Sequence, residues 1–170
     1  MSFEIYLKGT QTLDIKYSRV SDFHLTGYAN SDFDGDKENE LSTYGDLMTL
    51  GSATITWRSK KQTIPINSTT EVKYVAAALA TKEIVWLRKI LDDLQEKQTA
   101  STTLFVDNNS AIQLAMNPKF HDRTKHINIK YHLIQYHVEA KTIQLKHCST
   151  KEQIADIFTK ALGHVKFEQF

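Results

Sequence analysis

The chain has 170 residues, of which 41% are hydrophobic and 24% charged, a composition typical of one globular domain rather than a disordered chain. No apolar run approaches the ~20 residues that cross a bilayer, and the first residues lack the basic start and apolar stretch of a signal peptide. The net charge is +1, so any nucleic-acid surface must come from local clustering of Lys and Arg. A lone Cys148 cannot form an internal disulfide, so we expect an intracellular protein, cytoplasmic or nuclear. We also expect a monomer with no membrane partner.

Hydrophobic periodicity predicts an α/β domain with the element order three strands, helix, strand, two helices, strand, helix. The predicted strands cover residues 23–33, 44–50, 53–60, 103–106 and 142–146, and the predicted helices cover 68–96, 111–116, 127–139 and 150–162. Ser68 and Glu71 form a capping-box pattern at the start of the longest helix. The apolar neighbours of Trp57 and Trp86 predict that both indoles lie in the core.

One carboxylate has a position typical of a functional site. Asp107 directly follows the apolar strand 103–106 and precedes residues 108–110, which are good helix N-caps. Ligands of open α/β sheets collect at this edge, where strands end and helices begin. The alternative interpretation is that Asp107 only caps the following helix. Two further polar residues, Asn30 and Asp32, lie on one face of the first strand because strand side chains alternate.

Six groups of residues, in order along the chain, together resemble the ribonuclease H domain of the Pol polyprotein of copia-type long-terminal-repeat retrotransposons. The groups are Gly27–Asp36, Ser42–Gln62, Ser68–Tyr74, Asp107–Ile112, Phe120–His132 and Gln153–Lys160. The resemblance implies a ribonuclease H-like fold, with a five-stranded mixed sheet (an antiparallel meander plus parallel strands) and helices on both faces. It also implies a connection-segment remnant at 1–21, the ribonuclease H-like domain at 22–163 and a C-terminal tail at 164–170.

Members of this family hydrolyse the RNA strand of RNA–DNA hybrids with two Mg²⁺ ions held by four carboxylates. The resemblance places these carboxylates at Asn30, Lys73, Asp107 and Asp156, so that only the last two remain acids. With Asn30 neutral and Lys73 positive, the formal charge of the four positions changes from −4 to −1. A lysine ammonium repels a metal ion, so we expect weak Mg²⁺ binding at most and a catalytically degenerate domain.

Two alternatives remain open. Asp32 and Glu71 are possible substitutes for the missing acids, which would give an active Mg²⁺-dependent ribonuclease H that also uses Asp107 and Asp156. Glu71 is the poorer substitute, since it lies about 200° around the helix from Lys73. The other alternative is a protein-interaction module adopted by a host, with a surface unrelated to the old cleft.

Four basic residues are candidates for contacts with the phosphates of an RNA–DNA hybrid or another nucleic acid, namely Lys60, Lys61, Arg123 and Lys125. An ordinary solvated surface is the competing interpretation of these four side chains. Cys148 next to His147 is interpreted as a residue at a strand end rather than as a nucleophile, because no third group is placed to orient the pair.

Overall fold

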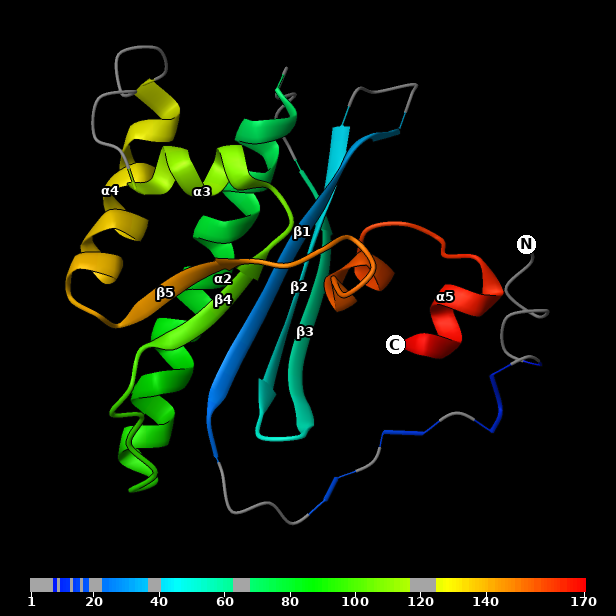
Figure 1. Ribbon diagram of the computed structural model, residues 1–170, viewed down its shortest axis with the longest axis horizontal. Helices are drawn as coiled ribbons and strands as arrows, with labels where there is room; N and C mark the ends of the chain where they lie inside the picture. The colour runs from blue at the N-terminus through cyan, green and yellow to red at the C-terminus, as the bar shows by residue number, and fades with distance from the viewer. Residues whose placement is uncertain are drawn as a thin grey trace.

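A five-stranded sheet with the strand order β3-β2-β1-β4-β5 forms the centre of the molecule (Figure 1). The computed structural model describes residue 8 and residues 10–12, 14–15, 17–18, 23–36, 41–62, 68–116 and 125–170, without the side chains of 33–36 and 125–131. The strands are β1 (Leu25–Asp36), β2 (Leu41–Leu50), β3 (Ala53–Lys61), β4 (Thr102–Val106) and β5 (Ile143–His147). β1, β2 and β3 pair antiparallel, whereas β4 is parallel to both β1 and β5. This arrangement confirms the predicted mixed sheet.

Helices cover both faces of the sheet, as predicted. Three helices, α2 (Thr69–Asp93), α3 (Asn109–Met116) and α4 (Lys125–Glu139), lie on one side, and the 3₁₀ helix η2 (Ile154–Phe158) packs on the other (Figure 1). The last helix, α5 (His164–Gln169), lies beyond η2. None of the helices in the described part of the chain is long and apolar enough to span a bilayer.

The main core lies between α2 and the sheet. Tyr74 and Ile84 of α2 are fully buried against strand residues such as Met48 and Leu104. The helix begins as the capping pattern predicts, because Ser68 Oγ accepts a hydrogen bond from the backbone N–H of Glu71 at 3.5 Å. The amino-terminal turn of α2, which carries Lys73, is thereby fixed next to the strand ends.

The prediction of a continuous helix over residues 150–162 is wrong. The chain instead forms the short helix η2, a connection, and then α5. Gln153 is fully buried, and its side chain donates to the Ala29 carbonyl and accepts from the N–H of Ala155. These side-chain bonds anchor the segment to the sheet and replace part of a helical ladder. Gly45 permits the close approach, since an added Cβ would lie 2.7 Å from the Cβ of Phe158.

An ion-pair network joins β2, β3 and α2 on the face of the sheet that α2 covers. The Arg58 guanidinium donates to both carboxylate oxygens of Asp46, with the shortest contact at 2.7 Å, and lies 3.1 Å from Glu83. It also donates to the Leu79 carbonyl at 3.2 Å. Burial raises the pKa of Asp46, and the Arg58 guanidinium opposes that rise. The network therefore ties α2 to the meander, and the loss of one member would leave a buried charge without its partner.

Both tryptophans are more exposed than their sequence neighbours suggest. Trp57 is 50% and Trp86 is 54% exposed, so the prediction that they lie in the core is wrong. Trp57 is on the edge strand β3, where its ring stacks on Phe158 with 6.5 Å between ring centroids. On α2, residues 84, 87 and 91 share the buried side, whereas position 86 lies on another side of the helix.

Candidate functional site

The first half of the candidate site is an ion pair between α2 and the end of β4. Asp107 directly follows β4, and its side chain is only 4% exposed. The ammonium of Lys73 lies 2.6 Å from each of its two carboxylate oxygens. The interpretation of Asp107 as a helix cap does not hold, because Asn108 Oδ1 accepts from the N–H of Ala111 at the start of α3. Asp107 is therefore occupied by an internal cation.

The second half of the site surrounds Asp156 in η2, which has a fully buried side chain. The amide nitrogen of Asn30, on β1, donates to one carboxylate oxygen of Asp156. The ammonium of Lys166, on α5, contacts the other oxygen, and that of Lys160 lies 3.4 Å from the first. Lys166 also donates to the Thr150 carbonyl at 3.0 Å. Asp156 is therefore neutralised by two lysines and hydrogen-bonded to the Asn30 amide.

The two halves are neighbours in the sheet. β1 and β4 are parallel with Ala29 opposite Val106, so the next residues, Asn30 and Asp107, lie about 5 Å apart where the pairing of these two strands ends. Asn30 is 2% exposed, and its Oδ1 has no hydrogen-bond partner among the described atoms. The structure therefore brings together all four positions that the resemblance identifies, from β1, α2, the end of β4, and η2.

The two possible substitute acids lie on the same elements as Asn30 and Lys73. Asp32 is partly buried on the same face of β1 and pairs in register with Thr43 of β2. Glu71 lies in the first turn of α2, next to the Ser68 cap. Because the Lys73 side chain reaches Asp107, helix geometry turns the Glu71 side chain about 200° away from the site.

The donor set does not suit a pair of divalent cations. Mg²⁺ takes oxygen ligands in near-octahedral geometry, and a two-ion site needs a dense cluster of carboxylates. Here the two remaining carboxylates carry three lysine ammoniums between them. Among the described residues, no group of three or more His, Cys, Asp or Glu side chains is placed to hold a metal ion.

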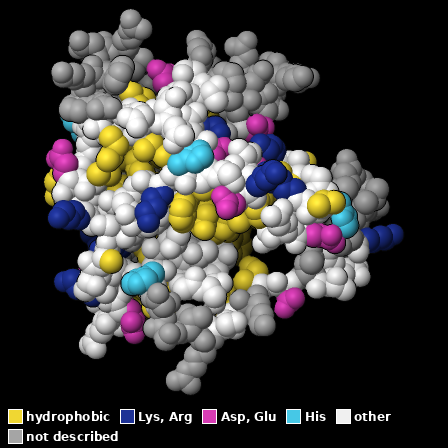
Figure 2. Space-filling model, in the orientation of Figure 1, with side chains coloured by type: hydrophobic (Ala, Val, Ile, Leu, Met, Phe, Trp, Pro, Cys, Tyr) yellow, Lys and Arg dark blue, Asp and Glu magenta, His cyan; other side chains and the backbone are white. Residues whose placement is uncertain are grey.

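The candidate phosphate-binding residues are only partly described. Lys60 and Lys61 are exposed at the end of β3. Lys61 pairs with Thr43 of β2, which in turn pairs with Asp32 of β1, so the three residues lie in one row across the sheet. Arg123 lies outside the described residues, and Lys125 begins α4 but its side chain is not described. On the face shown in Figure 2, Lys and Arg side chains are spread out with Asp and Glu side chains between them. The described side chains of that face form no continuous basic patch.

Cys148 lies close to the site but has an unreactive environment. It is 6% exposed, and its sulfur accepts a hydrogen bond from the Gln153 amide at 3.3 Å. Burial, with a contribution from the Asp107 charge, raises the pKa of the Cys148 thiol to about 11. These observations fit the interpretation of Cys148 as a structural residue at a strand end.

We expect Cys148 to resist alkylation by iodoacetamide in the native protein at pH 8. With a pKa of about 11, roughly one thiol in a thousand is ionised at that pH, and the thiolate is the reactive form. The rate should rise with pH up to that pKa and should increase sharply in denaturant. Mass spectrometry of timed samples measures both rates, and rapid native labelling at pH 8 would contradict the expectation.

Two lysines at the site were not identified as site residues by sequence reasoning. Lys166 lies in the segment predicted as a tail, yet its ammonium contacts Asp156. The position of α5 depends on the path of the connection after η2, which has no sequence signature. Lys160 lies four residues after Asp156, a spacing that favours an ion pair in a helix, and this was the available signal.

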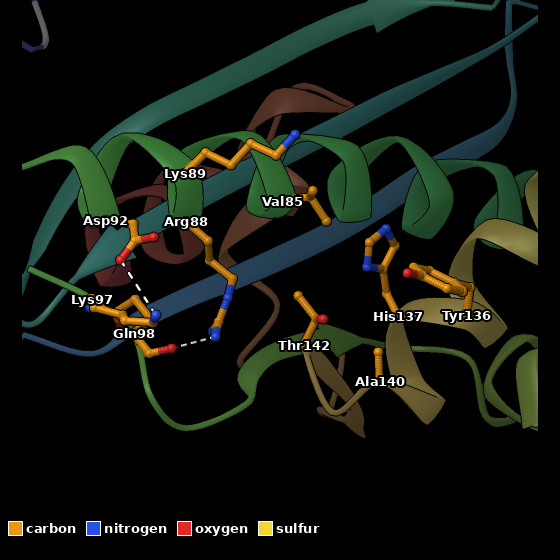
Figure 3. Close-up of a pocket in the computed structure, with 10 residues that line it drawn as sticks. All are labelled: Val85, Arg88, Lys89, Asp92, Lys97, Gln98, Tyr136, His137, Ala140 and Thr142. Carbon is orange, nitrogen blue, oxygen red and sulfur yellow. Dashed lines mark hydrogen bonds and ion pairs between the residues drawn. The ribbon is translucent and has the colours of Figure 1, made fainter.

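A cavity of about 290 Å³ lies at the other end of the molecule, between α2, α4 and the start of β5 (Figure 3). Thr142 in its wall precedes β5, so it is roughly 16 Å from the site along the strand direction. The guanidinium of Arg88 donates to the carbonyls of Gln98 and Ala100 and to the Thr102 hydroxyl. Arg88 therefore anchors the connection between α2 and β4.

Comparison with known proteins gives two kinds of relative. No family model matches the chain. It is 36% identical over 165 residues to the retrovirus-related Pol polyprotein from transposon RE1 of Arabidopsis thaliana, which covers 97% of this chain and 11% of that protein. It is 39% identical over 163 residues to the Pol polyprotein from transposon TNT 1-94 of Nicotiana tabacum, covering 96% and 12%. The chain thus spans about a tenth of these curated relatives.

Solved structures show the same fold at low identity. LC11-RNase H1, crystallised in complex with an RNA/DNA hybrid, superposes with a TM-score of 0.58 and 14% identity over 79% of this chain and 93% of that one. The fold of these structures agrees with the predicted mixed sheet. The chain is a homologue of one segment of the Pol polyproteins of copia-type transposons, and it has the ribonuclease H-like fold.

Proposed function

We propose that this domain binds RNA–DNA hybrids or related duplexes without hydrolysing them. The proposal is carried by one observation, namely that both remaining carboxylates are bound by lysine ammoniums. Two ions about 4 Å apart activate water and stabilise the leaving oxygen in two-metal hydrolysis. An ammonium at each carboxylate opposes such binding, because a like charge at 4 Å costs on the order of 4 kcal/mol at an effective dielectric near 20.

Support for binding comes from the fold and from the exposed lysines. LC11-RNase H1, which shares the fold, was crystallised with an RNA/DNA hybrid. Lys60, Lys61 and Lys160 are exposed on or near the side where β1 and β4 end. Phosphate contacts by such residues give an affinity that falls steeply with salt.

Two assays with a labelled RNA–DNA hybrid test the proposal. We expect no cleavage in Mg²⁺ or Mn²⁺ and a fluorescence anisotropy signal for binding that weakens as salt rises. Asp107→Asn is the matched variant for the first assay, because it removes an acid that hydrolysis would need. Hybrid cleavage that Asp107→Asn abolishes would contradict the non-catalytic part. Absence of hybrid binding at low salt would contradict the other part.

A protein-binding role is the second candidate, and the outer edge of the sheet favours it. Ile55 and Trp57, which are 36% and 50% exposed, lie on the edge strand β3. An exposed apolar edge is a common site for partner proteins. Under this alternative the hybrid would not bind.

A further inference from the structure

The charged groups of the site form two levels. The carboxylates of Asp107 and Asp156 form the buried level, with 4% and 0% of their side chains exposed. The side chains of Lys73, Lys166 and Lys160 are 15%, 30% and 40% exposed. The acids are thus buried, and the cations above them are partly exposed. A metal-loaded carboxylate site would present its charges to a phosphate in the same order.

The net charge of the site is also no lower than that of an occupied site. In the family, four carboxylates and two Mg²⁺ ions sum to zero. Here two carboxylates and three ammoniums leave one positive charge. Asn30 adds no charge, and it uses its amide hydrogen on Asp156. A phosphate that approaches this site therefore meets a net positive charge without any added cation.

The ammoniums also retain hydrogen-bonding capacity. A lysine ammonium has three N–H donors. Lys73 directs two of them at the oxygens of Asp107, and Lys166 directs one at Asp156 and one at the Thr150 carbonyl. Within the described part of the chain, one donor on each of these two lysines is left for a further acceptor. Phosphate oxygens are strong acceptors for such charged donors.

We propose that Lys73, Lys160 and Lys166 form a metal-independent phosphate-binding site for the backbone of a hybrid duplex. The lysines bridge carboxylate and phosphate in the way that a metal ion would, so binding needs no divalent cation. This inference rests on the proposed binding of hybrids and names the contact that replaces the metal. It differs from that proposal in requiring these particular lysines rather than the general surface.

The affinity for a labelled RNA–DNA hybrid, measured by fluorescence anisotropy at matched ionic strength, tests the site. We expect the Kd in EDTA to be no weaker than in Mg²⁺. Lys166→Met should weaken binding by roughly threefold to tenfold and lower the slope of log K against log salt by about 1. Lys166→Arg should keep both values near wild type, because it keeps the charge.

Lys97→Met is the control, since Lys97 is 71% exposed beside Asp92 at the far end of the molecule and should leave affinity and slope unchanged. Thermal unfolding of each variant shows that the fold is intact. Lys166 lies on a helix without buried residues, and Asp156 keeps Lys160 and Asn30 as partners when Lys166 is replaced, so the variant should fold with a lowered melting temperature. The inference is overturned if Mg²⁺ is required for binding, or if Lys166→Met and Lys97→Met act equally. Complete absence of hybrid binding would instead remove the proposed function itself.

Discussion

Replacing Asn30 by Asp together with Lys73 by Glu should create Mg²⁺ binding at a site where we expect little in the present protein. The double change adds two acids and removes the ammonium that contacts Asp107 at 2.6 Å. Each added or removed charge at about 4 Å is worth on the order of 4 kcal/mol at an effective dielectric near 20. Binding of Mg²⁺ should therefore tighten at least tenfold even if solvent screens most of this energy. Calorimetric titration with Mg²⁺ measures the change directly, and cleavage of a hybrid in Mn²⁺ measures the chemistry.

Thermal unfolding gives an independent reading of the same variant. Without metal, Asp107 would lose its internal cation next to a new carboxylate, so the melting temperature should fall. Added Mg²⁺ should raise it again, because a ligand that binds only the folded state stabilises that state. Lys97→Glu changes the net charge in the same way as Lys73→Glu but lies at the far end of the molecule, so it should not respond to Mg²⁺. A double variant that binds no Mg²⁺ would show that the four positions lack the required geometry.

Among single substitutions of partly exposed side chains on the face of the sheet that α2 covers, Arg58→Met should cause the largest loss of stability. It leaves Asp46, with a side chain that is 2% exposed, without its bidentate partner. Removal of one member of a buried pair costs about 3 kcal/mol or more, and the partial exposure of Arg58 favours the lower figure. For a domain of this size that loss corresponds to a melting temperature lower by roughly 6–12 °C.

The pH dependence of this loss has a definite sign. Burial already raises the pKa of Asp46, and removal of the opposing Arg58 charge raises it further. The penalty is therefore present at neutral pH and shrinks as the pH falls towards the pKa of Asp46, where the carboxyl takes up a proton. Urea unfolding at pH 7 and pH 5 tests this. Arg58→Met with Asp46→Asn should recover part of the stability, and equal losses at both pH values would contradict the explanation.

Regular periodicity explains which parts of the fold the sequence predicts well. The alternating pattern around Asn30 and the apolar stripe of α2 determine a strand and a helix, and both form close to the predicted residues. Asp107 was identified because a strand, a carboxylate and helix-capping residues follow one another directly. Local pattern and tertiary structure agree at these positions, since each element buries the face that its own period defines.

The segment after Thr150 shows where local pattern fails. Its apolar spacing predicts a helix, but the buried Gln153 bonds the segment to β1 and only η2 forms. The contact between Lys166 and Asp156 depends on this altered path, so no spacing in the sequence indicates it. The exposure of Trp57 also depends on tertiary position rather than on local pattern. Trp57 lies on an edge strand, which has no further strand or helix to cover its outer residues.

The hydrogen bond between Asn30 and Asp156 joins residues that are 126 positions apart. Synthesis proceeds from the amino terminus at about 5–20 residues per second, so β1 and α2 are complete well before η2 exists. During that interval Lys73 can already pair with Asp107, whereas Asp156 must wait for the ten further residues that bring Lys166. A nascent chain therefore completes the pair of Lys73 and Asp107 before the pair of Lys166 and Asp156.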